Sequence, residues 1–248
     1  MDKLDKMITS KQNALIKEIR SLSDKKFRDK LGLFVVEGIK PINEAVALSM
    51  PVRTVICTEK AFSQLKLLDV QAQLVTDEVL KSVSEEVTPQ GALAVVQKPC
   101  TPVQAPKGSC LLLDDVSDPA NVGAIIRTAA ASGYNDVYLT ENCADAYSQK
   151  SVRASMGGIF RTRVMRADVD TLLSVIDLPI YVADMNGDNV FSHDAKDRLC
   201  LVIGNEGHGV SEVVKGKADF TVKIPMENGM ESLNAAVSAG ILMYSLKK

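Results

Sequence analysis

The sequence has 248 residues, enough for one large domain or two small ones. Apolar residues make up 46% and charged residues 24%, which is typical of a soluble protein, and no apolar run approaches the ~20 residues of a membrane span. The net charge of −2 excludes a basic field over the whole surface, so any nucleic-acid surface must be local. Aromatic residues, at 4%, disfavour stacking of bases on an aromatic platform.

The cysteines and the N-terminus indicate a reducing compartment. Five cysteines occur without a CxxC pair, which predicts buried thiols and neither a disulfide framework nor a metal site. They are Cys57, Cys100, Cys110, Cys143 and Cys200. The polar N-terminus predicts no signal peptide. We therefore expect a cytoplasmic protein without a membrane segment or a metal.

The first 30 residues are locally basic, with nine Lys or Arg against five Asp or Glu. Thr9 or Ser10 is the predicted cap of a helix. Its apolar positions follow helical spacing and should point inward; they are Leu15, Ile16, Ile19 and Leu22. A solvated face is the simpler interpretation of the cations, and a phosphate-binding arm is the alternative, which the run KKFR at 25–28 favours.

Apolar runs then alternate with polar helical stretches up to residue 97. The predicted strands cover residues 34–36, 52–57, 74–75 and 92–96. The predicted helices cover residues 41–47, 61–67 and 77–83. The proline-rich run KPCTPVQAPKG has no periodicity and predicts a linker. We expect one α/β domain at 1–98, a linker at 99–108 and a second domain at 109–248.

The second domain again alternates strands and helices, which favours a mostly parallel sheet. The predicted strands cover residues 110–113, 137–139, 163–165, 180–183, 199–203 and 220–224. The predicted helices cover residues 121–132, 148–156 and 168–176, with a last helix after Ser232 or Asn234. His193 falls in a polar loop and receives no role.

The stretch DDVSDPANVGAIIRTAAASG at 114–133 is the centre of this pattern. Asp118-Pro119 predicts a turn, Asn121 stands where a helix N-cap belongs, and Gly133 ends the helix. An apolar stripe follows helical spacing; it comprises Val122, Ile125, Ile126 and Ala129. Arg127 lies off this stripe. Because ligands of open α/β sheets bind at the carboxyl ends of strands, Asn121 and Arg127 can serve a ligand or be a simple cap and a solvated side chain.

Two later stretches are also unusual. The most apolar strand runs into GNEGHG at 204–209, which is neither GxGxxG nor a P-loop, so a phosphate cradle is disfavoured. Its glycines allow a tight turn or a close approach to a ligand, and Glu206 is hard to explain by turn geometry alone. The last helix carries small residues that another backbone can approach closely. These are Ala235, Ala236, Ser238, Ala239 and Gly240.

Three segments, DPANVGAIIRTAAASG, LVIGNEGHGV and IPMENGMESLNAAVSAG, resemble in this order the three motifs of the SpoU (TrmH-like) RNA ribose methyltransferases of the SPOUT superfamily. ITSKQNALIKEIRSL, KKFR and FVVEG resemble the small substrate-binding domain of ribosomal-RNA members. Ala235-Ala236 departs from the more usual Val-Ser, but both changes keep a small or medium volume.

The resemblance implies an α/β-knot fold, with a C-terminal trefoil knot and a mostly parallel sheet preceded by a small α/β substrate-binding domain. It implies homodimers and bound S-adenosylmethionine. The residues it places around this cofactor are Gly204, Ile224 and Leu233, together with Ile203, Gly207 and Ala183.

The resemblance also implies site roles. Arg127, aided by Asn121, would bind the target phosphate and ribose and orient the 2′-hydroxyl, because a guanidinium rarely loses a proton and is a poor base. Glu206 and Asn234 would hold the cofactor loops or Arg127, and Ser232 would hydrogen-bond near the substrate. The RNA-binding candidates are Lys17, Lys25, Lys26, Arg28 and Arg153.

The expected activity is therefore S-adenosylmethionine-dependent methylation of a ribose 2′-hydroxyl of RNA, with ribosomal RNA favoured over transfer RNA by the N-terminal resemblance. A non-catalytic RNA- or ribosome-binding protein with the same fold is a second possibility. A nucleotide-dependent enzyme on a Rossmann-like sheet is a third, disfavoured by the missing GxGxxG. A base methyltransferase of the same superfamily fits the three motifs less well.

Overall fold

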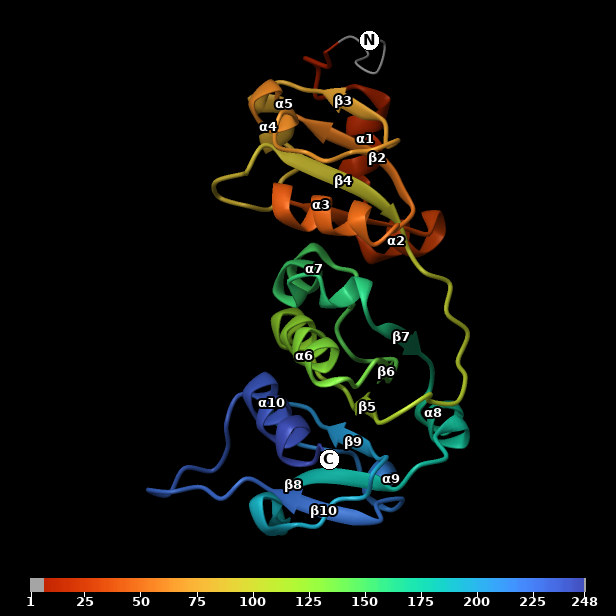
Figure 1. Cartoon of the computed structure of the whole chain (residues 1–248), viewed down its shortest axis with the longest axis vertical. Helices are drawn as coiled ribbons and strands as arrows, with labels where there is room; N and C mark the ends of the chain where they lie inside the picture. The colour runs from red at the N-terminus through yellow and green to blue at the C-terminus, as the bar shows by residue number, and fades with distance from the viewer. Residues whose placement is uncertain (1–6, 248) are drawn as a thin grey trace. The chain divides into compact units, whose positions relative to one another are not determined.

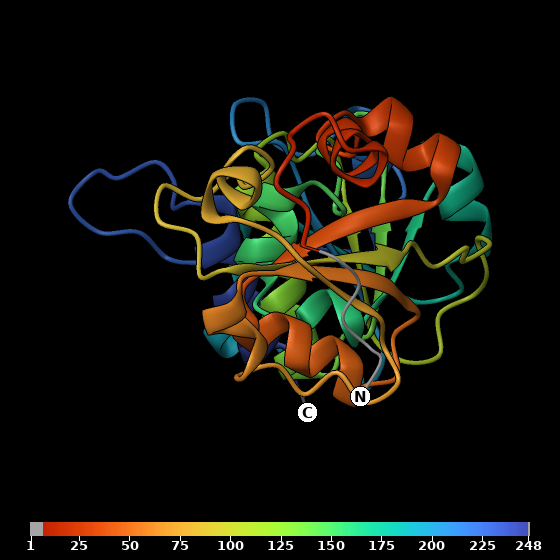
Figure 2. The same cartoon turned by 90° about the horizontal axis from the view of Figure 1, so that it is seen from above.

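The computed structural model describes residues 7–247, which divide into two compact units. Unit 1 comprises the chain up to Cys100 together with Tyr147–Arg153, and unit 2 comprises the remainder. Figures 1 and 2 show the elements from two directions. The cations Lys3 and Lys6 of the basic stretch lie outside the described residues. None of the helices over 7–247 has the length and apolarity that crossing a membrane requires.

Unit 1 is built on a four-stranded sheet with the order β1-β4-β2-β3. The strand β4 is antiparallel to β1 and β2, whereas β2 and β3 are parallel. The strands are β1 (Leu33–Glu37), β2 (Val52–Cys57), β3 (Ala72–Leu74) and β4 (Ala92–Gln97). The helices are α1 (Ala14–Ser21), α2 (Lys25–Leu31), α3 (Ile39–Ala47), α4 (Glu59–Phe62) and α5 (Asp77–Lys81). The predicted strands are thus confirmed to within a few residues.

The core of unit 1 lies between α1, α5 and one face of this sheet. Ile16, Ile19 and Leu22 are fully buried there, as their spacing predicted, and Leu15 packs against them at the edge. The sheet contributes alternate residues such as Val35, because successive strand side chains point to opposite faces.

The first helix begins later than predicted. Its N-cap is Asn13, whose side chain accepts a hydrogen bond from the amide of Leu15, and neither Thr9 nor Ser10 caps it. The reason is tertiary: the Ile8 amide donates to the Leu74 carbonyl, which holds Ile8 extended, and a turn at Lys11 and Gln12 then precedes the cap.

The helix predicted over 61–67 is also wrong in its extent, since α4 ends at Phe62. The side chain of Asn43 on α3 donates to the Gln64 carbonyl and accepts from the Lys66 amide. These bonds satisfy backbone groups that a longer helix would have paired internally.

Arg28 is not on the surface, which corrects its assignment as an RNA contact. It is only 4% exposed, and its guanidinium donates to the carbonyls of Leu22 and Ser23 at 2.7 Å each. A guanidinium offers several donors in a fixed plane and therefore suits carbonyls left unpaired after a helix. Arg28 thus holds α2 against the end of α1.

Unit 2 contains a six-stranded sheet with the order β10-β8-β9-β5-β6-β7, and every neighbouring pair is parallel, as predicted. The strands are β5 (Cys110–Leu113), β6 (Asp136–Leu139), β7 (Arg163–Arg166), β8 (Ile180–Asn189), β9 (Cys200–Ile203) and β10 (Phe220–Lys223). The helices are α6 (Pro119–Ser132), α8 (Val169–Val175), α9 (Glu212–Lys215) and α10 (Ala235–Ser245), with short 3-10 turns η1 (Gly158–Phe160) and η2 (Val190–Ser192). Helix α7 (Gln149–Ser155) is divided between the units after Arg153.

Helix α6 buries its predicted stripe and ends at Gly133 in the left-handed conformation, as expected. Its N-cap, however, is Asp118 and not Asn121. Pro119 occupies the first helical position, where its fixed φ and missing N–H are favourable, so the cap is the residue before it, three positions earlier than predicted. Asn121 is therefore inside the first turn, and its buried side chain is free for tertiary contacts.

Strand β8 is longer than predicted because its pairing with β10 jumps. Val182 is opposite Thr221, but the next pair is Asp188 with Val222, so residues 183–187 bulge out of the ladder. Close passage of the two backbones requires Gly187, since a Cβ there would lie 2.5 Å from the Val222 nitrogen. His193, expected to be a solvated loop residue, is half-buried with its ring edge-on to Tyr181.

Replacing Arg28 by alanine should lower the free energy of unfolding by about 2–3 kcal/mol, because two backbone carbonyls lose charge-assisted partners. Lys26→Ala, an exposed change on the same helix, should cost less than about 0.5 kcal/mol. Urea unfolding followed by circular dichroism measures both. Equal small effects would contradict the structural role of Arg28.

Candidate active site

The carboxylate of Glu206, in the turn after β9, is the meeting point of two loops. One oxygen accepts from the Ser117 amide at 3.2 Å and the Ser117 hydroxyl at 3.1 Å. The other accepts from the side-chain amide of Asn121 at 2.8 Å and from the Asp118 amide at 3.4 Å. Glu206 thus binds the turn before α6 through main-chain and side-chain donors together.

Asn121 passes this contact on to the last helix. Its Oδ1 accepts from Nδ2 of Asn234 at 2.9 Å, and Oδ1 of Asn234 caps α10 by accepting from the amides of Ala236 and Val237. Because an ionised carboxylate only accepts, Glu206 fixes which way each amide in the series must face. We refer to these three residues as the Glu206–Asn121–Asn234 chain.

The hydrogen bonds keep Glu206 ionised. Burial by itself would raise the pKa of its carboxyl, but the bonds from the Asn121 side chain and the Ser117 amide and hydroxyl outweigh burial and hold the pKa below its ordinary value. A carboxylate saturated with donors is a poor proton acceptor. Glu206 is therefore suited to holding loops in place and not to accepting a proton from a substrate.

The glycine-rich turn that carries Glu206 is held closely against the strand end. The Asn205 and Gly209 backbones exchange hydrogen bonds at 3.0 Å, and the Ser211 amide donates to the buried carboxylate of Asp114 at 2.7 Å. At Gly204 a Cβ would lie 2.2 Å from the Gly209 carbonyl carbon, so a side chain is excluded there. The sequence expectation of close backbone approach is correct for Gly204, but its nearest neighbour is the turn itself.

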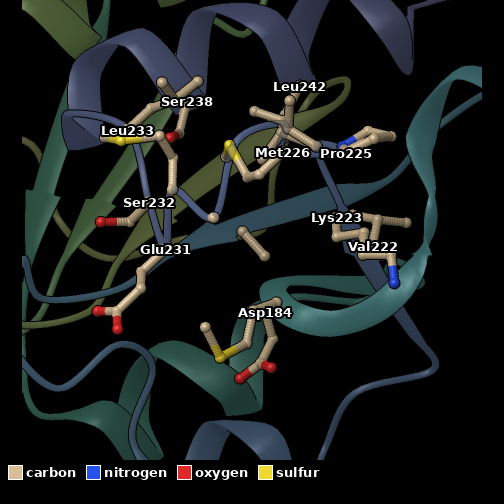
Figure 3. Close-up of a pocket in the computed structure, with 15 residues that line it drawn as sticks. Asp184, Val222, Lys223, Pro225, Met226, Glu231, Ser232, Leu233, Ser238 and Leu242 are labelled. Atoms are coloured by element: carbon tan, nitrogen blue, oxygen red, sulfur yellow. The ribbon is translucent and has the colours of Figure 1, made fainter.

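A pocket of about 570 Å³ lies beside α10 in unit 2 (Figure 3). It is formed by the bulge of β8, the end of β10, the long loop after β10 and one face of α10, from which Ser238 and Leu242 line it. Ala183, Ile224, Ser232 and Leu233 line it as well, so four of the expected site residues lie together.

Ile203, Gly204 and Gly207 are not among the lining residues. Ile203 is buried at the end of β9, and Gly207 is exposed with its amide donating to the Asn205 side chain. These residues therefore shape the turn near the pocket and do not form its wall.

Sequence reasoning missed several residues of this region. Asp184 lines the pocket, with its carboxylate accepting from the Asn186 amide and paired with Lys215 at 3.3 Å. The Asn186 bond, aided by Lys215 against a smaller effect of burial, holds the pKa of Asp184 below its ordinary value. Its position directly after an apolar strand was an available signal, whereas Ser117 gave none beyond preceding Asp118-Pro119.

Arg127 lies on the exposed side of α6 and has no hydrogen-bond or ion-pair partner among residues 7–247. Its backbone is closely packed, since a Cβ on Gly158 would lie 2.8 Å from the Arg127 Cα. It does not line the pocket. The guanidinium of Arg127 is therefore exposed on a helix whose first turn is held by the Glu206–Asn121–Asn234 chain.

The remaining expected contacts lie in unit 1. Lys17 and Lys26 are exposed, Lys25 is paired with Asp29 at 2.6 Å, and Arg153 is paired with Glu86 at 3.0 Å. Pairs this exposed contribute little to stability. No group of three potential metal-ligating side chains is found within 7–247.

Gly204→Ala should lower the free energy of unfolding by about 2–3 kcal/mol, because the added Cβ meets backbone atoms that cannot rotate away. Gly207→Ala is the matched control, since its Cβ would meet only the Asn205 side-chain oxygen at 3.4 Å. Denaturant unfolding compares them. A control as damaging as Gly204→Ala would contradict this role of close backbone packing.

Asn121→Asp should place a second carboxylate against Glu206 and destabilise the protein by about 2–3 kcal/mol at pH 8. Like charges raise the folded-state pKa of one carboxyl, so the penalty shrinks as pH falls through that raised value toward about 4. The wild type should show no such recovery, because the pKa of Glu206 is lowered and its contribution is lost only below its usual 4.5. Thermal unfolding between pH 5 and 8, with the exposed Asn228→Asp as control, measures this; a penalty independent of pH would refute the contact.

Comparison with known proteins relates both units to characterised families. The sequence model of the SpoU rRNA Methylase family matches residues 108–244, and that of the MRM3-like substrate binding domain matches residues 13–94. The chain is 31% identical to the 23S rRNA (guanosine(2553)-2′-O)-methyltransferase RlmP of Bacillus subtilis, over 98% of this chain and 99% of the relative. It is 32% identical to the 23S rRNA (uridine(2479)-2′-O)-methyltransferase of Streptomyces viridochromogenes, over 90% and 85%.

Solved structures agree over both units. An AdoMet-bound rRNA methyltransferase from Sinorhizobium meliloti superposes with a TM-score of 0.87 at 26% identity, covering 98% of this chain and 97% of that one. The SpoU methyltransferase AviRb from Streptomyces viridochromogenes, in complex with AdoMet, superposes with a TM-score of 0.83 at 29% identity, covering 95% and 97%. The resemblance drawn from the three motifs is thereby confirmed. The family model over residues 108–244 and the relatives at 31% and 32% identity show that this protein belongs to the SpoU rRNA methylase family.

Proposed function

We propose that this protein is an S-adenosylmethionine-dependent methyltransferase that modifies a ribose 2′-hydroxyl of ribosomal RNA. The observation that carries the proposal is the Glu206–Asn121–Asn234 chain, which joins the three family motifs beside an open pocket. Relatives aligned over most of the chain are named for methylating 23S rRNA on a ribose, and two similar structures hold AdoMet.

The pocket fits the cofactor. Its volume of about 570 Å³ lies within the usual range of roughly 300–1,000 Å³ for small-molecule sites. It lies at the carboxyl end of β10, where open α/β sheets bind ligands. Ala183, Ile224 and Leu233 would hold the cofactor, with Gly204 and its neighbours shaping the adjoining turn. When bound, S-adenosylmethionine supplies a methyl group on a positively charged sulfur.

Arg127 is assigned to the RNA. A guanidinium keeps its proton at neutral pH and binds phosphate through paired N–H donors, so Arg127 orients the target nucleotide and stabilises negative charge on its 2′-oxygen. Asn121 binds Glu206 and Asn234 through its side-chain amide and is assigned the positioning of α6, in support of Arg127. Ser232, at the pocket, is assigned a hydrogen bond near the substrate.

Unit 1 is assigned to RNA recognition through Lys17, Lys25, Lys26 and Arg153. The exposed pairs of Lys25 and Arg153 are weak enough to exchange for RNA phosphates, which would give salt-dependent binding. The functional division is then RNA binding in residues 1–98 together with Arg153, a linker at 99–108 and catalysis in the rest of 109–248. The proposed RNA substrate and the five free cysteines favour a cytoplasmic location.

The family resemblance also leads us to include a homodimer and a C-terminal knot in the proposal. Leu233, Val237 and Tyr244 follow one stripe at the start and along α10 and are 38%, 50% and 56% exposed, which suits a second copy of the chain. The close backbone crossing at Gly187, between β8 and β10, suits the threading that a knot needs.

Purified protein should transfer label from methyl-labelled S-adenosylmethionine to a ribose 2′-oxygen of ribosomal RNA taken from cells that lack the gene. Arg127→Ala should reduce this transfer at least ~100-fold, because a donor aimed at the reacting oxygen is lost. Its Kd for S-adenosylmethionine should stay within about threefold, since Arg127 does not line the pocket.

Lys217→Ala, an exposed change in the same unit, is the control and should transfer normally. Near-normal turnover by Arg127→Ala would remove Arg127 from the mechanism. Transfer to transfer RNA alone, or to a base, would refute the substrate assignment.

A further inference from the structure

Asp115, between β5 and α6, has a backbone conformation that is uncommon for any residue other than glycine. Its φ is +60°, in the left-handed region, where a residue with a Cβ costs roughly 1–2 kcal/mol relative to the right-handed form. Such a conformation persists only where the surroundings impose it, and functional sites are one place where it occurs.

The residue is held by the loop after β6. The Asp115 amide donates to the hydroxyl of buried Thr140 at 2.9 Å, and that hydroxyl donates back to the Asp115 carboxylate at 2.6 Å. Asn142 donates to the other carboxylate oxygen at 3.2 Å. The holding loop is itself fixed, because the Arg166 guanidinium donates to several of its carbonyls, including that of Ala144 at 2.6 Å.

The held turn determines where Glu206 can bind. The Asp115 carbonyl accepts from the Asn205 side chain at 2.8 Å, so it is tied to the residue just before Glu206. Two residues further on, Ser117 directs its amide and hydroxyl at the Glu206 carboxylate. The backbone conformation of Asp115 therefore determines where its own carbonyl meets Asn205 and where Ser117 meets Glu206.

We infer that Asp115 is a positioning residue for the active site, which acts through Glu206 and is clamped by Thr140 and Asn142. Asp115 contacts neither the pocket nor Arg127 and has no chemical role of its own. The expected effect of Asp115 on the reaction rests on the proposed methyl transfer. Its effect on the position of the turn does not.

The test compares Asp115→Ala, which loses the clamp and disfavours positive φ, with Asp115→Asn, which keeps an acceptor and tolerates positive φ. Asp115→Ala should lower kcat for RNA methylation about tenfold at a temperature well below its melting transition, and Asp115→Asn should stay within about threefold of wild type. Thr140→Val should behave like Asp115→Ala, and Glu141→Ala, an exposed acid on the same loop, should behave like wild type.

A double-mutant cycle separates positioning through Glu206 from general destabilisation. In a Glu206→Gln background, Asp115→Ala should cause little further loss of kcat, because the contact it supports is already broken. Additive losses, or a normal kcat for Asp115→Ala, would overturn the inference.

Amide hydrogen exchange of the ligand-free protein, followed by NMR, judges the turn without cofactor or RNA. Exchange at Ser117 and Asp118 should accelerate at least about tenfold in Asp115→Ala and little in Asp115→Asn. Unchanged exchange in Asp115→Ala overturns the inference. If exchange accelerates in Asp115→Ala but the wild type transfers no methyl group, the proposed function is wrong and the positioning of the turn by Asp115 still holds.

Discussion

The site depends on one carboxylate, Glu206, to which donors from a turn almost ninety positions earlier converge. Parallel strands bring the loops after β5 and β9 to the same edge of the sheet, but they do not fix those loops relative to each other. Glu206 does so because it accepts from main-chain and side-chain donors at once. Since a carboxylate cannot donate, the amide nitrogen of Asn121 must face Glu206, and the amide nitrogen of Asn234 must in turn face Asn121. The orientation of both side chains is therefore fixed.

That arrangement connects the pocket to Arg127. Asn234 caps α10, and the two residues before it line the pocket. Asn121 belongs to the first turn of α6, which further along carries the exposed side chain of Arg127. The N-termini of both helices are thus held by one set of hydrogen bonds, so the pocket wall and the cation share a common frame. Asp115 extends that frame back to the loop after β6. Preorganisation of this kind is what a transfer between two bound groups requires, because positioning supplies much of the rate.

The periodicity of the sequence correctly predicted the features that depend on residues close together in the chain. The apolar stripe of α6, its end at Gly133 and the parallel sheet of unit 2 are consequences of periodicity and of glycine geometry. The errors arose where distant partners decide: β3 holds Ile8 extended and delays α1, and the carbonyls of Leu22 and Ser23 bury Arg28. Glu206 stood out in the sequence because a turn of glycines has no need of a carboxylate. Ser117 and Asp115 did not, since their importance comes from partners far along the chain that no spacing reveals.

The most direct test is a crystal structure of the protein with S-adenosylhomocysteine bound. The adenosine and the homocysteine chain should lie against Ala183, Ile224 and Leu233. The side-chain amide of Asn121 should still donate to Glu206, and that of Asn234 should still donate to Asn121. A ligand bound elsewhere, or a pocket filled while the Glu206–Asn121–Asn234 chain is broken, would contradict this arrangement.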